Sequence, residues 1–456
     1  MKTFDTINPE NGHTLNTYTY LTEAELSDRL SLSASAYKWW KCQSFQYRTQ
    51  CITAIIKKME ENIESAAQLI TQEMGKPIVQ AFTEIHKCID LCQYYSGLSE
   101  ATLALEHIPM DDYHKSYVRF DPIGVIFGIM PWNFPFWQVL RYSIPNILIG
   151  NTVLLKHAPN TTACGLFIEK LFIEADLPEG VFQTLVIDLP QVETVIAHAA
   201  VQGITLTGSN KAGSIVAALA GKYIKKSTLE LGGNDAFIVM KDANVKSTAQ
   251  IAAASRLNNT GQTCVSAKRF VVDQTIATEF IEAVIEEMKA YPGGNLYDEH
   301  TKLGFISRTD LAEKLLRQYC DAVINGAKVC LHTQREGNFF SPALLQTKAD
   351  NPILKEELFG PIGLILTFSS ESEMLHLVND TPYGLSASIW TQDLDKAEAL
   401  ATGIDTGMVF VNDMVRSYPY LPFGGVKQSG YGRELSTAAL KEFLNWKTIV
   451  IKQITS

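Results

Sequence analysis

The chain has 456 residues, of which 46% are hydrophobic and 19% charged, and a chain of this size can bury a large core divided between two or three domains. Its formal net charge of −10 gives no uniform basic field for phosphate backbones, so we expect no nucleic-acid partner. No run of about eighteen apolar residues occurs and the first residues lack the apolar segment of a secretory leader, so the sequence predicts no membrane partner.

Eight cysteines are scattered along the chain without paired CxxC blocks, and the nine histidines form no HExxH motif. Scattered single cysteines are typical of proteins in a reducing compartment, where thiols stay free. We therefore expect a cytoplasmic protein with free thiols and no metal site.

The first part of the chain predicts a helical segment, and alternating strands and helices follow it. Residues 21–74 are rich in helix formers with apolar residues three and four apart, and Gly75-Lys76-Pro77 supplies a stop. After Tyr117, short β-branched runs alternate with amphipathic stretches. The expected strands are 125–129, 152–155, 184–187, 204–207, 228–231 and 236–240, and the expected helices are 162–174, 192–199 and 211–220.

Strands that alternate with helices in this way are typical of right-handed crossover units on a parallel sheet, so the sequence predicts an α/β nucleotide-binding architecture. Two further strands, 116–121 and 447–453, belong to no such unit, and the residues alone leave open whether they form edges of the domains. A second α/β domain is predicted by a later series, with strands at 268–273 and 407–412 and helices at 278–289 and 312–323.

A glycine-containing turn follows the expected strand 204–207. Gly208 comes directly after the strand, and Gly213 follows five residues later at the start of a helix. Glycines at such a turn let backbone N–H groups and the helix N-terminus approach a pyrophosphate. The spacing is Gly-x4-Gly rather than GxGxxG, so the turn alone fits an ordinary strand-to-helix connection equally well.

Cys264 and Glu230 are candidate reactive side chains. Most lone cysteines are buried small hydrophobes, but Cys264 has small polar neighbours in TGQTCVS, and these favour an accessible, reactive thiolate. Glu230 is an acid within an apolar strand that precedes two glycines, where burial would raise its pKa toward the range of a general base. The alternative for Glu230 is a solvent-facing position on an edge strand.

The loop 131–135, with the sequence PWNFP, carries a third candidate. Two prolines fix the backbone around Asn133, and an amide held in this way can donate an N–H to a developing oxyanion. A plain proline turn capped by Asn133 is the alternative. The loop alone favours that alternative until the other motifs are considered.

Seven sequence blocks together resemble the aldehyde dehydrogenase superfamily, and the match runs from Asn8 to Phe443. Seven blocks in one order are very specific, and jointly they favour the functional interpretation of each motif. The blocks are PWNFP at 131–135, LLK ending at Lys156, TGS at 207–209, LELGGN at 229–234, GQTC at 261–264, EELFGP at 356–361 and PFGGVKQSGYGRE at 422–434.

The resemblance implies a reaction and the residues that perform it. Cys264 is the implied nucleophile, Asn133 and the Cys264 backbone N–H form the oxyanion hole, and Glu230 activates water. An aldehyde substrate becomes a thiohemiacetal, loses hydride to NAD or NADP, and leaves as an acid after hydrolysis of the thioester. The implied cofactor contacts are Trp132, Lys156, Thr207, Gly208, Ser209, Gly213, Leu231, Glu357 and Phe359.

Among these contacts, the resemblance assigns Lys156 to the adenosine ribose, Ser209 to the pyrophosphate and Glu357 to the nicotinamide ribose, with Phe359 beside the ring. The implied fold has a Rossmann-like cofactor domain, an α/β catalytic domain and a small β arm that extends a neighbouring subunit's sheet. The assembly is then a homodimer or a homotetramer. The domain limits are 1–102 and 123–231 for the cofactor domain, 232–440 for the catalytic domain, and 103–122 and 441–456 for the arm.

Within the superfamily the chain is most similar to succinate-semialdehyde dehydrogenases, especially a shorter bacterial type that has KHAPN at this place, here 156–160. A guanidinium at Arg141 could hold the far carboxylate of a semialdehyde bidentately. Longer enzymes of this kind have a second arginine where this chain has Asn258, and Arg256 or Arg416 could replace that charge. Ser417 or Tyr418 could add a hydrogen bond. Glutarate semialdehyde or an uncharged aliphatic aldehyde remains an alternative.

The cofactor preference depends on Pro159, which stands where strongly NAD-preferring relatives carry a glutamate that repels a 2′-phosphate. With Lys156 and His157 nearby, NADP can therefore serve beside or instead of NAD. Val265 follows the nucleophile, which excludes a disulfide between adjacent cysteines. A relative that passes its thioester to coenzyme A is disfavoured by Glu230, and an inactive binding protein, as in lens crystallins, by the intact set of reactive residues.

Overall fold

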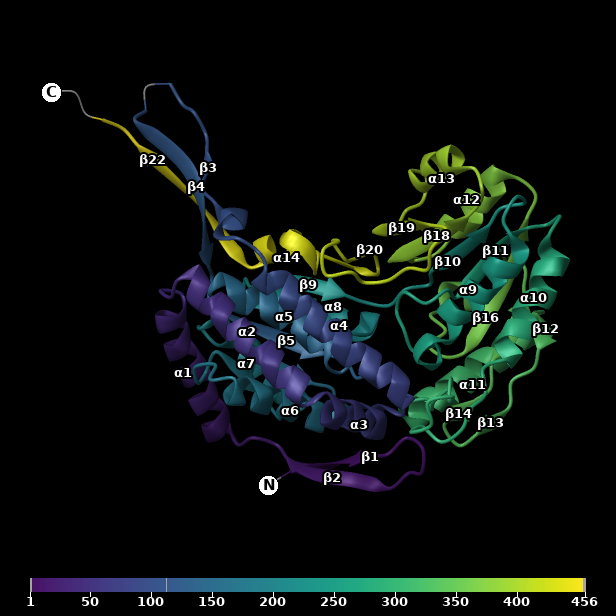
Figure 1. Cartoon of the computed structure of the whole chain (residues 1–456), viewed down its shortest axis with the longest axis horizontal. Coiled ribbons are helices and arrows are strands. Elements are labelled where there is room, and N and C mark those ends of the chain that lie inside the picture. Colours follow the sequence, from purple (N-terminus) through teal and green to yellow (C-terminus); the bar gives the residue numbers. More distant parts are fainter. Residues whose placement is uncertain (1, 112, 454–456) are drawn as a thin grey trace.

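The computed structural model describes residues 2–111 and 113–453. It has two lobes, each built on a mainly parallel sheet, and a narrow arm that projects from the first lobe (Figure 1). Residues 1, 112 and 454–456, which fall within the predicted limits of the cofactor domain and the arm, lie outside the described residues. The architecture confirms the predicted α/β fold class, and the limits of the domains stay a prediction.

The first lobe contains a six-stranded sheet in the order β21-β9-β8-β5-β6-β7. All neighbours run parallel except β21, which pairs antiparallel with β9. β6 is buried at every residue, as expected for a parallel sheet that is covered on both faces. The strands are β5 (Val125–Met130), β6 (Thr152–His157), β7 (Phe182–Thr184), β8 (Val201–Thr207), β9 (Lys226–Glu230) and β21 (Gly430–Tyr431).

Capping residues set the ends of several helices in this lobe. Thr22 and Glu25 form a capping box on α1, and Gly75 ends α3 with φ 78°, a left-handed conformation that glycine adopts without strain. The predicted helical segment 21–74 is therefore divided into three helices. The helices are α1 (Glu23–Trp40), α2 (Phe45–Glu61), α3 (Ile63–Met74), α4 (Ile78–Ser96), α5 (Trp137–Ile149), α6 (Thr162–Glu174), α7 (Leu189–Ala197) and α8 (Asn210–Lys222).

The second lobe contains a seven-stranded sheet in the order β12-β15-β16-β11-β10-β18-β19. Only β12 pairs antiparallel, at one edge of the sheet. The strands are β10 (Ala236–Val239), β11 (Arg269–Asp273), β12 (Lys328–Leu331), β15 (Ala343–Gln346), β16 (Ile362–Phe368), β18 (Ser386–Trp390) and β19 (Met408–Val411). The helices are α9 (Val245–Leu257), α10 (Ala277–Lys289), α11 (Thr309–Ile324), α12 (Glu371–Asn379) and α13 (Leu394–Ala401).

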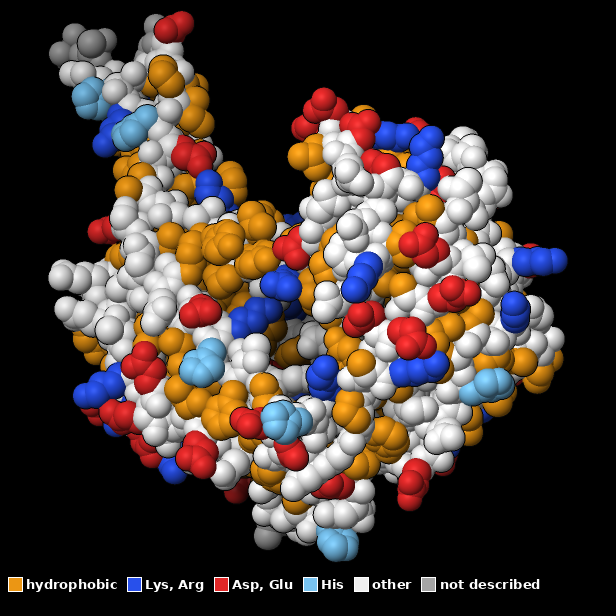
Figure 2. Space-filling view, turned by 45° about the vertical axis from the view of Figure 1, so that its right-hand side comes forward, with side chains coloured by type: hydrophobic (Ala, Val, Ile, Leu, Met, Phe, Trp, Pro, Cys, Tyr) orange, Lys and Arg blue, Asp and Glu red, His pale blue; other side chains and the backbone are white. Residues whose placement is uncertain are grey.

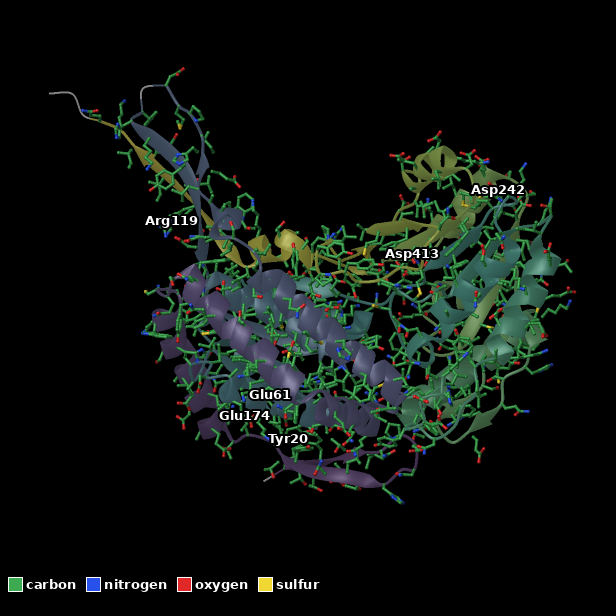
Figure 3. The ribbon with its side chains drawn as sticks, viewed as in Figure 1. Tyr20, Glu61, Arg119, Glu174, Asp242 and Asp413 are labelled. Atoms are coloured by element: carbon green, nitrogen blue, oxygen red, sulfur yellow. The ribbon has the colours of Figure 1, made fainter. Side chains whose placement is uncertain are left out.

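The arm is a separate three-stranded antiparallel sheet. β4 (Lys115–Pro122) pairs along its whole length with β22 (Leu444–Ile451), which follows α14 (Ser436–Glu442), and β3 (Glu106–His107) pairs with the other side of β4. Arg119 lies on this arm, which projects from the first lobe (Figure 3). The two strands predicted at 116–121 and 447–453 therefore pair with each other. The alternative that they are edges of the domain sheets is wrong.

Two parts of the first lobe differ from the expectations. An N-terminal hairpin of β1 (Thr3–Ile7) and β2 (Thr14–Thr19) lies below the lobe in Figure 1, and no signal predicted it. The predicted strand 184–187 is shifted, because β7 ends at Thr184 and Ile187 N–H turns back to the carbonyl of Leu185. Leu185 N–H still donates to the carbonyl oxygen of Leu155 on β6 at 2.7 Å, and the side chains of Leu185 and Ile187 are buried in the core, which accounts for their apolar character.

The remaining elements are short. Small two-stranded pairs join β13 (Arg335–Glu336) with β14 (Phe339–Phe340) and β17 (Tyr383–Gly384) with β20 (Val426–Lys427). Single 3-10 turns lie at Glu100–Leu103, Pro159–Thr161, Asn258–Gly261 and Pro352–Lys355. Within residues 2–111 and 113–453, no helix is both long enough and apolar enough to cross a membrane.

Candidate active site

Cys264 lies on a loop with an unusual backbone. The preceding residues Asn259, Thr260 and Gly261 have φ values of 54°, 55° and 73°, all in the left-handed region that non-glycine residues rarely adopt. A Cβ on Gly261 would lie 2.3 Å from the carbonyl oxygen of Gly360, so only glycine fits there. The loop is held in a conformation that costs energy, as often occurs where a side chain must be aimed at a reaction.

Asn133 is buried beside this loop. Its Nδ2 donates to the carbonyl oxygen of Gln262 at 3.0 Å, and the side chain of Asn259 donates to the carbonyl oxygens of Asn133 at 2.8 Å and Gln262 at 3.2 Å. Asn259 therefore ties the PWNFP loop to the nucleophile loop. An amide nitrogen carries two N–H groups, so one hydrogen of Asn133 Nδ2 remains for an oxyanion near Cys264.

A buried ion pair between Lys76 and Glu84 contacts the PWNFP loop and the start of α5. Lys76 Nζ lies 2.5 Å from Glu84 Oε2 and 4.0 Å from the ring centroid of Phe134, and both charged side chains are almost fully buried. The other carboxylate oxygen of Glu84 accepts the backbone N–H groups of Phe136 at 2.9 Å and Trp137 at 3.1 Å. Glu84 thus satisfies the free amides at the N-terminus of α5. No motif in the sequence indicated this ion pair.

The Cys264 thiol is in a site that combines burial with nearby positive charge. Burial raises its pKa to about 11, while the charges of Lys268 and Arg141 act in the opposite direction. Lys268 is fully buried, and its ammonium donates to the carbonyl oxygen of Thr263 at 3.1 Å and to that of Cys264. The thiol is therefore protonated near neutral pH, and its attack on a substrate requires transfer of the proton to a base.

Glu230 is buried at the end of β9, so the alternative of a solvent-facing position is wrong. Burial raises the pKa of its carboxyl well above the usual range, and the neighbouring carboxyl of Glu434 adds to the rise. Oxygen Oε1 has no hydrogen-bond partner among the described residues, and a Cβ at Gly424 would lie 2.7 Å from it. A buried carboxyl with a raised pKa and a free oxygen is suited to a general base.

A cavity of about 540 Å³ opens at Cys264. Of the residues predicted for the substrate, Arg141, Asn258 and Ser417 line it, whereas the predicted catalytic residues Asn133 and Glu230 do not. Figure 2 shows the surface hollowed between the two lobes, with Lys and Arg side chains beside the hollow. The structure therefore gathers the predicted substrate residues around the predicted nucleophile.

The arginines near the cavity differ in what they bind. Arg141 forms an ion pair with Glu434, donates from Nη2 to Thr207 Oγ1 at 3.2 Å, and lies 4.7 Å from the ring centroid of Phe423. Arg256 is fully buried and donates to the carbonyl oxygens of Gly261 and Gly360, both at 2.6 Å. The expectation that Arg256 could bind a carboxylate is therefore wrong, because its donors hold the nucleophile loop.

Lys156 and His157 end strand β6. Lys156 is buried, and among the described residues it has no ion-pair partner and donates only to the His157 carbonyl oxygen, at 3.5 Å. Burial lowers the pKa of its ammonium. A buried ammonium with so little local hydrogen bonding fits the hydroxyls or phosphate of a nucleotide. His157 does not share this role, because burial lowers its pKa to about 4 and its Nε2 bonds the carbonyl oxygen of Pro135 at 2.9 Å.

The TGS turn gives a helix N-terminus that can receive a phosphate. The Ser209 hydroxyl caps α8 by accepting from Ala212 N–H at 3.3 Å, and a Cβ on Gly208 would meet only Leu206, at 3.7 Å. Gly213 has a different role from the one expected, because a Cβ there would lie 2.6 Å from Leu231 Cδ2. Gly213 and Leu231 therefore bring α8 close to the sheet and act on the turn indirectly.

Three more predicted cofactor residues lie together. The rings of Trp132 and Phe359 meet edge to face with centroids 5.8 Å apart. Glu357 Oε1 accepts Gly233 N–H at 3.0 Å and lies 3.6 Å from Lys268 Nζ, which links it to the nucleophile loop. A Cβ on Gly232 would lie 2.6 Å from the other carboxylate oxygen, so the glycine pair lets Glu357 approach.

The comparisons with known proteins agree with this geometry. The sequence model of the aldehyde dehydrogenase family matches residues 1–449. A probable succinate-semialdehyde dehydrogenase (NADP(+)) of Synechocystis sp. is 38% identical, with 98% of this chain and 99% of that protein covered. The Escherichia coli K12 protein named succinate semialdehyde dehydrogenase (NAD(P)+) Sad is also 38% identical, with 97% and 96% covered.

Solved structures extend the match to three dimensions. The crystal structure of succinic semialdehyde dehydrogenase from Streptococcus pyogenes, in complex with NADP+, superposes with a TM-score of 0.96 at 35% identity and covers 99% of this chain and 100% of that one. These matches confirm the resemblance that the seven sequence blocks indicated. On its sequence and its fold, the chain belongs to the aldehyde dehydrogenase family.

Proposed function

We propose that this protein oxidises succinate semialdehyde to succinate with NADP or NAD. The observation that carries the proposal is the cavity at Cys264, whose wall includes the guanidinium of Arg141 and the polar side chains of Asn258 and Ser417. A cationic wall suits an aldehyde that carries a carboxylate at its far end. Relatives that are 37–39% identical to this chain are named succinate-semialdehyde dehydrogenases, which supports the same substrate.

In this proposal the Cys264 thiol first loses its proton to solvent, and the resulting thiolate attacks the aldehyde carbon and forms a thiohemiacetal. Asn133 Nδ2 and the Cys264 backbone N–H stabilise the oxyanion, because their donors are fixed before the reaction begins. A bound nicotinamide would supply the hydride acceptor, and loss of hydride from the thiohemiacetal carbon would leave a thioester on Cys264. Glu230 then takes a proton from water, the resulting hydroxide attacks the thioester carbonyl, and the acid leaves as the Cys264 sulfur is released.

The residues around Lys156 fit a dinucleotide. The weakly bonded ammonium of Lys156 is available to ribose hydroxyls or a 2′-phosphate, and Pro159 offers no carboxylate that would repel the phosphate. Ser209 and the N-terminus of α8 would hold the pyrophosphate, and Glu357 the nicotinamide ribose. The same contacts admit NAD, so we propose both cofactors.

The arm supports a homo-oligomer. β22 forms the outer edge of the arm sheet and β19 the outer edge of the seven-stranded sheet, so each offers unpaired backbone groups to a second copy. Trp446 is 52% exposed on β22. We propose a homodimer or homotetramer, which light scattering on the purified protein would measure. All eight cysteines are free, which supports a reducing compartment such as the cytoplasm.

The test of the proposed substrate uses the wild-type protein with succinate semialdehyde and butanal, each with NADP and NAD. We expect a kcat/KM for succinate semialdehyde that exceeds that for butanal by at least about tenfold, the lower limit for a charge-assisted hydrogen bond. Equal values for the two aldehydes would make this protein a general aliphatic aldehyde dehydrogenase. A larger value for glutarate semialdehyde would extend the substrate by one carbon.

A further inference from the structure

Lys87 is a further cation in the wall of the cavity, and no sequence motif pointed to it. It lies on α4 and lines the same cavity as Cys264. Its Nζ donates to Ser417 Oγ at 2.6 Å and lies 4.0 Å from the ring centroid of Trp137. Among the described residues, no carboxylate lies within 4.0 Å of this ammonium, so the charge has no direct counter-ion.

The partner of Lys87 is well placed to share a ligand. Ser417 is buried, and its oxygen accepts a hydrogen bond from Lys87, so its own O–H remains free to donate. The ammonium has three N–H groups and uses one for Ser417. Lys87 and Ser417 therefore present several donors and one positive charge to the cavity.

Arg141 is less free than Lys87. Its guanidinium is paired with Glu434 and bonded to Thr207, so its charge is already balanced inside the protein. Arg416 also lines the cavity, but it is exposed to solvent, where an ion pair is worth little. The cation with the least local compensation is thus Lys87.

We propose that Lys87 and Ser417 form a further anchor for the far carboxylate of the substrate beside Arg141, whose guanidinium also holds Glu434 near Glu230. This rests on the proposed function, because it needs a substrate with a carboxylate. Burial of a carboxylate is favourable only where hydrogen bonds and opposite charge compensate its lost hydration. Lys87 and Ser417 supply both, and a neutral aldehyde of the same length would leave them unpaired.

The protonation of Lys87 gives the anchor a pH dependence. Burial lowers the pKa of Lys87 to about 8, so the ammonium is charged below this pH and neutral above it. The KM for succinate semialdehyde should therefore rise as the pH increases from 7 to 9.5. The titratable and charged groups around Lys87 are Glu84 and Cys88 on α4, Arg141 on α5 and Cys264 on the nucleophile loop, and His86, Asp90 and Arg416 line the same cavity.

The experiment compares Lys87→Gln and Lys87→Arg with wild type, using succinate semialdehyde and butanal from pH 7 to 9.5. We expect Lys87→Gln to raise the KM for succinate semialdehyde about ten- to a hundred-fold at pH 7 and to remove most of the preference over butanal. Lys87→Arg should restore much of the affinity and make KM independent of pH, because its guanidinium stays charged. Lys170→Gln, the same change at an exposed position of α6, is the matched control and should alter neither the KM for succinate semialdehyde nor that for butanal.

Three outcomes would overturn the anchor. The first is a wild-type preference for succinate semialdehyde that Lys87→Gln leaves intact, which would keep the proposed function and reject only Lys87. The second is that Arg416→Gln, and not Lys87→Gln, loses the preference for succinate semialdehyde over butanal. The third is a KM in Lys87→Arg with the same pH dependence as wild type. A lower thermal midpoint of Lys87→Gln would leave Lys87→Arg as the deciding variant, while a wild type without any preference would reject the proposed substrate itself.

Discussion

The ion pair of Lys76 and Glu84 predicts a large and testable loss of stability. Glu84→Gln keeps the size of the side chain and one acceptor for the α5 amides, but it places a neutral group against a fully buried ammonium. Removal of one partner of a buried pair costs about 3–5 kcal/mol. Because Lys76 lies 4.0 Å from the ring centroid of Phe134, beside Asn133, kcat should fall as well.

The pH dependence of this loss has a defined sign. In the variant, burial alone acts on Lys76 and lowers its pKa further below that of the unfolded chain, so folding must release a proton. The penalty is therefore largest at low pH and decreases by about 1.4 kcal/mol per pH unit as the pH approaches the unfolded pKa near 10.4. Thermal midpoints of wild type and Glu84→Gln should then be further apart at pH 6 than at pH 9.

A double variant isolates the pair. Lys76→Met combined with Glu84→Gln removes both charges, so its thermal midpoint should be higher than additivity of the two single variants predicts. If Glu84 served only as a helix cap, the decreases in thermal midpoint of the two single variants would add in the double variant. The difference between wild type and Glu84→Gln would then not depend on pH. That result would refute the assignment of the ion pair as the support of the PWNFP loop.

Three other changes test the reacting groups. Asn133→Ala should lower kcat by about 10²–10³, the usual effect of one lost oxyanion donor, with KM affected less. Glu230→Gln should still release one equivalent of reduced cofactor in a rapid burst and then stall as the thioester, whereas an equal loss of the burst would assign Glu230 to the first step. Gly213→Ala would place a methyl 2.6 Å from Leu231 Cδ2 and should cost about 1–3 kcal/mol and weaken cofactor binding, measured by calorimetry.

Much of the fold follows from local patterns that the sequence displays. The strand runs at 125–129 and 152–155 are continuous and apolar because β5 and β6 are covered on both faces, and such runs are visible without any structure. The hairpin β1 and β2 gave no signal, because most of its residues are exposed and alternate only weakly. The arm strands were visible, but which strands they pair with depends on contacts more than 300 residues apart in the chain.

The reacting residues were predictable because they occur in blocks, whereas their supports were not. Glu84 and Lys87 are three residues apart on one helix, a spacing typical of exposed ion pairs. In the structure Glu84 caps α5 and Lys87 lines the cavity, because α4 packs against α5 and the loop at Ser417. Such roles depend on the tertiary packing of distant segments, which local spacing does not encode.

The bond between His157 and Pro135 has a consequence for the order of binding. The neutral imidazole of His157 joins the end of β6, which carries the proposed cofactor residue Lys156, to the loop that carries Asn133. A displacement of Lys156 on cofactor binding would therefore reach the oxyanion donor through one rigid link. If cofactor binding raises the affinity for the aldehyde in this way, thermodynamic linkage requires that aldehyde binding raise the affinity for the cofactor by the same factor.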